Sequence, residues 1–191
     1  MLRGNWKTIP RGLFSGTGIE KLVIPEGVTE IGVGAFFGSS LKEVVLPRTL
    51  RKIGDDAFRG TQLTRLTIPE GVTEIGFGAF LDSSLKEVVL PSTLTQIGNS
   101  AFSRTQLKNV LVPSSVREIG PDAFNSTPLE VINLPYGLQL IGSGAFRNTK
   151  LETIEIPESV TYLDDYTLAN IPTLKSVYLP KSLTTFAQSC L

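Results

Sequence analysis

The sequence contains no histidine, so it lacks the side chain that most often serves as a general base and as a metal ligand in proteins. Its single cysteine, Cys190, excludes a disulfide within the chain, and we expect it to be a small apolar core residue rather than a nucleophile. The sequence also has no G-x-S-x-G motif, phosphate-binding glycine loop or Cys/His zinc spacing. These absences disfavour an enzyme and a metal site, and we expect no cofactor.

Charge of one sign is not in excess, because 18 basic residues balance 18 acidic ones. Without a basic stripe, we expect no binding to nucleic acid or to an anionic membrane surface. No apolar run approaches the roughly 20 residues that a membrane-spanning helix needs. Residues 1–12 lack the apolar stretch of a signal peptide. The expectation is either an intracellular protein or a piece of a longer exported one.

The sequence does contain an internal repeat with a period of 22 residues. Segments 24–47 and 68–91 are almost identical and lie two periods, 44 residues, apart. The units share the consensus L-x-x-V-x-L-P-x-x-V-x-x-I-G-x-x-A-F, from which the last two units depart after the proline. Such a period is typical of a solenoid, whose units bury their apolar faces only by stacking on one another. The first apolar residue of each unit, position one below, is Ile19, Leu41, Leu63, Leu85, Leu107, Leu129, Leu151 or Leu174.

These units predict a single domain over residues 1–191, which is long enough to bury a sizeable core. Residues 1–18 form a partial N-terminal unit, and residues 19–150 form six regular units. Residues 151–191 form degenerate units, which we interpret as a C-terminal cap because terminal repeats of solenoids are usually atypical. We expect Trp6 to cover the exposed N-terminal end of the stack.

Within a unit, the β-branched run at positions four to six predicts a short parallel strand that the following proline ends. The Val-x-x-Ile-Gly segment predicts a second extended piece, whose glycine either needs positive φ or has no room for a Cβ. The phenylalanine is expected to fill the interior. The hydroxyl residue three positions later, such as Thr61, is expected to satisfy turn amides in a ladder. We therefore expect a coil made of short strands and loops, in which strands of successive turns lie about 4.8 Å apart.

This repeat resembles the BspA-like class of leucine-rich repeats. The L-x-x-V-x-L core looks like a leucine-rich repeat, the continuation P-x-x-V-x-x-I-G-x-x-A-F resembles that class, and eight consecutive units match. Ser or Thr stands where many units of the class carry Cys or Asn. The resemblance implies a right-handed leucine-rich-repeat β-solenoid with parallel strands on its concave face. It also implies a binding or adhesion role, and it supplies no catalytic residues.

Positions three and five of each strand are expected to point outward. Position three alternates in charge along the first four units, which fits a solvated salt ladder or the border of a binding surface. Position five is largely apolar over five units, which strand propensity or a binding strip would explain. The candidate partner-binding residues are Lys21, Val23, Glu43, Val45, Arg65, Thr67, Glu87, Val89 and Leu111.

The pattern therefore favours a non-catalytic scaffold that binds a protein partner with its concave sheet, as an adhesion or surface-recognition module. The alternative is a natural or designed structural module that stacks end to end, as a monomer or a weak dimer through its terminal repeats. The tyrosines of the terminal units, Tyr162, Tyr166 and Tyr178, are an alternative contact surface. If the chain is a piece of an exported protein, we expect it outside the cell or at the cell surface.

Overall fold

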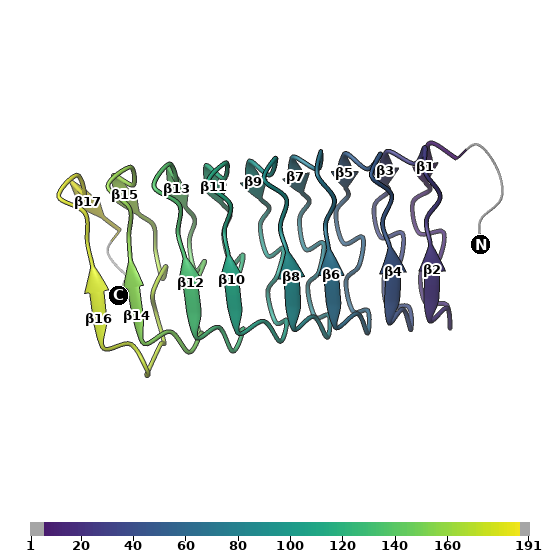
Figure 1. The fold of residues 1–191 in the computed structure, drawn as a ribbon. Coiled ribbons are helices and arrows are strands. Elements are labelled where there is room, and N and C mark those ends of the chain that lie inside the picture. The colour runs from purple at the N-terminus through teal and green to yellow at the C-terminus, as the bar shows by residue number, and fades with distance from the viewer. Residues whose placement is uncertain (1–5, 188–191) are drawn as a thin grey trace.

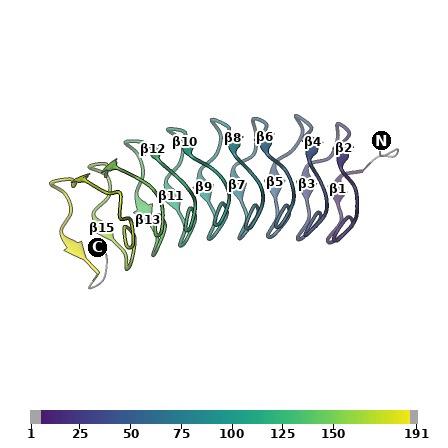
Figure 2. The same ribbon diagram turned by 90° about the horizontal axis from the view of Figure 1, so that it is seen from below.

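The computed structural model describes residues 6–187, so the prediction for Cys190 lies outside the described residues. Eight strands of three residues and nine of two residues follow one another, and no helix occurs in this range (Figure 1). The chain rises through the longer strands on the near side and crosses the top through the shorter ones. It then descends on the far side while it advances from right to left (Figure 1). The predicted right-handed solenoid of parallel strands is confirmed (Figure 2).

The two kinds of strand alternate along the chain. The longer strands are β2 (Lys21–Val23), β4 (Glu43–Val45), β6 (Arg65–Thr67), β8 (Glu87–Val89), β10 (Asn109–Leu111), β12 (Val131–Asn133), β14 (Thr153–Glu155) and β16 (Ser176–Tyr178). The shorter strands are β1 (Thr8–Ile9), β3 (Glu30–Ile31), β5 (Lys52–Ile53), β7 (Glu74–Ile75), β9 (Gln96–Ile97), β11 (Glu118–Ile119), β13 (Leu140–Ile141), β15 (Tyr162–Leu163) and β17 (Thr185–Phe186).

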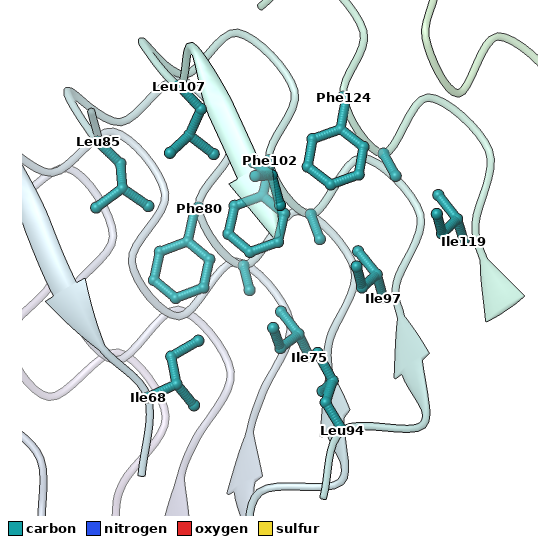
Figure 3. Packing of buried hydrophobic residues seen from close by; sticks show 14 of the residues in the cluster. Ile68, Ile75, Phe80, Leu85, Leu94, Ile97, Phe102, Leu107, Ile119 and Phe124 are labelled. Atoms are coloured by element: carbon teal, nitrogen blue, oxygen red, sulfur yellow. The ribbon is translucent and has the colours of Figure 1, made fainter. Parts of the chain in front are cut away.

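A column of stacked phenylalanines fills the interior of the coil, as the repeat predicts. From Phe14 to Phe146, successive rings lie 5.1 to 6.0 Å apart between centroids and are close to parallel. The rings from Phe36 onward are fully buried, and a parallel row of isoleucines from the shorter strands packs beside them (Figure 3). Trp6 is partly buried against the first turn of this core, which agrees with its expected place at the N-terminal end.

The buried hydroxyl column has a different role from the one expected. Thr61 and Thr105 donate a hydrogen bond of 2.8 Å to the carbonyl of the phenylalanine three residues earlier, and do not satisfy amides. In this turn the neighbouring amides already donate to carbonyls, as that of Phe58 does to Ala79 of the next turn at 2.7 Å. The hydroxyl is therefore left to bond a carbonyl. The serines at this position, Ser39 and Ser83, have no hydrogen-bond partner for their Oγ atoms.

The shorter strands form one continuous parallel sheet of seven strands, from β1 to β13. The glycine that follows each of the strands from β3 to β13 allows this sheet to form through close approach rather than through positive φ. A Cβ on Gly98 would lie 2.4 Å from the carbonyl oxygen of Ile75 in the preceding turn. The Gly98 amide donates to that same oxygen at 2.9 Å. Asp164 occupies the glycine position in the seventh unit. The seven-stranded sheet ends before this unit, since β15 forms no ladder with β13 and pairs only with β17.

Replacing Asp164 by glycine is expected to extend the sheet from β13 to β15. Without the side chain, the amide of residue 164 gains access to the carbonyl of Ile141, as the amide of Gly142 already has to Ile119. Hydrogen exchange measured by NMR should then show slower exchange of this amide in the variant than in the parent. Unchanged exchange would contradict the steric explanation and would place the cause in the extra residue of the seventh unit, since Leu151 and Leu174 are 23 residues apart instead of 22.

The longer strands do not form the single sheet that the repeat predicts. They pair two by two, as β2–β4, β6–β8, β10–β12 and β14–β16, without backbone pairing between the pairs in residues 6–187. The phenylalanine rings hold the turns farther apart than the about 4.8 Å of a β ladder, so a coil of this pitch cannot keep ladder spacing on every side. Gaps at alternate turns relieve this mismatch. The expected concave position of these strands stays a prediction.

Candidate binding surface

The surface that carries the eight longer strands, called the strand face below, contains all of the predicted site residues. Position four points inward in every pair, and positions three and five point to solvent, so the predicted strand register is confirmed. Val45 and Val89 are 59% and 60% exposed, and Leu111 is 74% exposed. The row of outward apolar side chains at position five is therefore present. These side chains project into solvent and are not part of the hydrophobic core.

The alternating charges at position three make ion pairs, but only inside the strand pairs. Lys21 Nζ lies 2.9 Å from Glu43 Oε1, and Arg65 Nε lies 3.4 Å from Glu87 Oε2. No ion pair joins Glu43 to Arg65 across the gap between β4 and β6 in the described chain. All of these side chains are well exposed, so each pair contributes about 1 kcal/mol or less to stability. The ladder fixes register within each pair rather than along the whole stack.

A second row of ion pairs lies one residue earlier, at position two. Lys42 Nζ approaches Glu20 to 2.7 Å, and this cation holds the pKa of the Glu20 carboxyl below its ordinary value. Glu130 and Glu152 are paired in the same way with lysines of the adjacent strand in their own pair. Most carboxylates on the strand face are therefore neutralised by a neighbouring cation.

The gap between β4 and β6 forms an open groove of about 450 Å³. Its lining includes Val45, Thr67 and Val89 from the apolar row, with Arg65 and Glu87 as its charged border. A smaller hollow of about 270 Å³ over β2 and β4 contains Lys21, Val23 and Glu43. The structure thus brings every predicted site residue except Leu111 into two adjoining hollows.

The sequence does indicate that the longer strands pair two by two, but this becomes visible only when alternate units are compared, rather than all units with one 22-residue pattern. At position six a β-branched residue alternates with leucine through all eight units. The β-branched members, such as Ile24 and Ile68, directly follow the first strand of each pair and are buried, whereas Leu46 and Leu90 directly follow the second strand and are only partly buried. The structural repeat of the strand face is therefore 44 residues, two units long.

A third groove, of about 380 Å³, lies between β12 and β14 and was not anticipated. Tyr136 and Tyr178 line it, and they are 80% and 63% exposed. The cluster of three tyrosines suggested by the sequence is not maintained in space. Only Tyr178 lies on the strand face, since Tyr162 belongs to β15 and the ring of Tyr166 lies under Arg147 at 5.4 Å from its guanidinium carbon.

The repeat places the chain in a family. A profile of BspA type leucine-rich repeat regions matches residues 7–130 and 97–191, which together span nearly all of the sequence, and it counts six copies. The chain belongs to the BspA type leucine-rich repeat family. The family match agrees with the resemblance drawn from the L-x-x-V-x-L-P pattern. No curated protein matches the chain significantly.

Solved structures of bacterial leucine-rich repeat proteins are similar to this BspA type chain. A leucine-rich repeat protein of T. pallidum is 26% identical with a TM-score of 0.65, over 84% of this chain and 70% of that one. A leucine rich cell surface protein of Faecalibacterium prausnitzii is 28% identical with a TM-score of 0.54, over 87% of this chain and 55% of that one. The pneumococcal vaccine antigen PcpA shares the fold, at 20% identity and a TM-score of 0.67, over 93% of this chain and 57% of that one.

Two other kinds of site, a cluster of metal-binding side chains and a membrane-spanning helix, are absent from the described part of this BspA type chain. Residues 6–187 contain no group of three or more His, Cys, Asp or Glu side chains placed to hold a metal ion. No helix in that range is long and apolar enough to cross a membrane. The strand face is the candidate binding surface because of its grooves and its outward apolar row.

Proposed function

We propose that this chain is a non-catalytic scaffold that binds a protein partner through its strand face, as an adhesion or surface-recognition module. The observation that carries the proposal is the exposed apolar row of Val23, Val45 and Val89, which follows the groove between β4 and β6. A strip of this kind with a charged border has the make-up of a protein interface, with an apolar centre and a polar rim.

Two further observations support this proposal. Family membership favours a protein-interaction role, because leucine-rich repeats present extended surfaces built from equivalent positions of successive units. One similar structure is described as a leucine rich cell surface protein, which supports a place outside the cell for this chain as well. The chain spans 55% of that protein, so the proposal concerns the repeat region alone.

The double variant Val45→Lys/Val89→Lys tests the proposal. Both side chains are well exposed, so the change in unfolding free energy is expected to be about 0.5 kcal/mol or less per site. A partner on the strip would have to bury two unpaired charges, which costs several kcal/mol and abolishes binding. The measurement is capture of partner proteins from the native surroundings, followed by affinity determination with the purified partner.

The matched control is Val33→Lys/Phe77→Lys. These residues are also separated by 44 residues and are 40% and 49% exposed, but they lie in the turns after β3 and β7 rather than on the strand face. The control should fold and retain binding. If the strand-face variant binds as well as the parent, the partner does not use the apolar row. If that variant unfolds while the control does not, position five contributes to the core.

A further inference from the structure

The groove between β12 and β14 differs in chemistry from the apolar grooves nearer the N-terminus. Position five changes from apolar residues to Asn133, Glu155 and Tyr178 in the last three units. Glu155 and Tyr178 are direct partners in the β14–β16 ladder, so both side chains project from neighbouring positions on the same face. Tyr136, in the turn after β12, lines the same groove.

Glu155 is the exception among the carboxylates of the longer strands. Glu43 and Glu87 each lie within ion-pair distance of a cation on the adjacent strand. Glu155 makes no ion pair or side-chain hydrogen bond within residues 6–187, because its neighbour in the ladder is Tyr178 instead of a lysine or arginine. The groove therefore combines an uncompensated negative charge with two exposed aromatic rings.

A second carboxylate, Glu158, also lines this groove. Its Oε1 atom accepts a hydrogen bond from the backbone amide of Lys181 at 3.3 Å, which leaves its charge without a cation in the described chain. The Lys181 ammonium makes no ion pair with Glu155 or Glu158 there either. Aromatic faces attract cations through the ring quadrupole, and nearby carboxylates reinforce this attraction.

We propose that this groove binds a cationic side chain, arginine or lysine, that a protein partner presents to the C-terminal part of the strand face. The inference rests on the proposed protein-binding function and names the chemistry at one end of the contact. An arginine fits both features of the groove, because its guanidinium plane stacks on tyrosine while its N–H groups bond a carboxylate. The apolar row and this groove would then be the two ends of one elongated docking surface.

The test is an NMR titration of the whole chain with Nα-acetyl-arginine amide, with Nα-acetyl-citrulline amide as a neutral probe of nearly the same shape. The arginine probe should produce saturable shifts at Glu155, Tyr178 and Tyr136 that weaken with added salt, and the citrulline probe should not. Glu155→Gln should weaken binding by about three- to fivefold. Tyr178→Leu should weaken it by about two- to fivefold.

The control variant is Glu152→Gln, which removes the same charge three residues earlier. Glu152 is already paired with Lys175 at 2.9 Å, so this change should leave the affinity for the arginine probe unaltered. The proposal is overturned by equal binding of citrulline, by the absence of saturable shifts, or by equal effects of the Glu155 and Glu152 variants. None of these outcomes depends on Val45 or Val89, so the cationic groove and the apolar row are tested separately.

Discussion

Replacing Phe80 by alanine is expected to lower the free energy of unfolding by about 3–5 kcal/mol, from lost transfer free energy and the cavity left behind. The ring is fully buried and stacks between Phe58 at 5.4 Å and Phe102 at 5.2 Å, measured between centroids. The turns above and below are held by backbone hydrogen bonds of 2.7 and 2.8 Å, so the column cannot collapse into the space. Urea unfolding followed by circular dichroism measures the change.

Phe77 provides the matched control, because it is the same residue type three positions earlier and is 49% exposed. Phe77→Ala should change the free energy of unfolding by less than about 1 kcal/mol. A loss for Phe80→Ala no larger than that for Phe77→Ala would contradict the role of the ring column as the core. Because units of a solenoid contact mainly their neighbours, the variant should also unfold first around the third unit.

Replacing Gly98 by alanine is expected to cost about 3 kcal/mol, at the upper end of the range for overpacking. The added Cβ would meet backbone atoms of the preceding turn, the Ile75 oxygen at 2.4 Å and the Gly76 carbonyl carbon at 2.9 Å. Backbone atoms in the middle of a seven-stranded sheet cannot move aside without breaking the ladder on both sides. The same urea experiment measures this loss.

Gly18→Ala is the control for this prediction. A Cβ added to Gly18 would have no atom within 4 Å and its φ is not positive, so the substitution should be close to neutral. At the C-terminal end, Ala187 occupies the position equivalent to Gly98, and its amide still bonds the Leu163 carbonyl at 3.1 Å. That hydrogen bond is longer than the one of 2.9 Å that Gly98 makes to Ile75 in the interior of the sheet. If Gly98→Ala were as mild as Gly18→Ala, the close approach at Gly98 would not limit the side chain at this position.

Several features of the fold could be predicted from the sequence because they repeat. A stack of identical units places each residue type above itself, so one assignment fixes a whole column. The inward position of Phe80, the outward position of Val45 and the parallel pairing of equivalent strands all followed from that rule. The glycine column was predicted with two alternatives, and the close approach at Gly98 selects one of them.

The hydroxyl column shows a limit of this reasoning. The sequence predicts that Thr105 meets the backbone, but whether it meets an amide or a carbonyl depends on which groups the next turn has already used. The amide of Phe102 donates to Ala123 at 2.9 Å, and its carbonyl accepts from Thr105 at 2.8 Å. Whether a backbone group is free to bond the hydroxyl depends on its hydrogen bonds to the neighbouring turn. The sequence pattern of a single unit does not show those bonds.

The sequence by itself determined the coil, its core columns and the outward row that includes Val45 and Val89, because each depends only on the period and on which residues are apolar. Only the tertiary structure decided how the strand face is divided. The spacing of the rings around Phe80 and the ladder spacing of the strands differ, and the difference opens gaps at every second turn. Glu155 and Tyr178 are neighbours within the β14–β16 ladder, and the gap before β14 leaves a groove that they share with Tyr136 of the preceding turn, so residues from three successive turns line it.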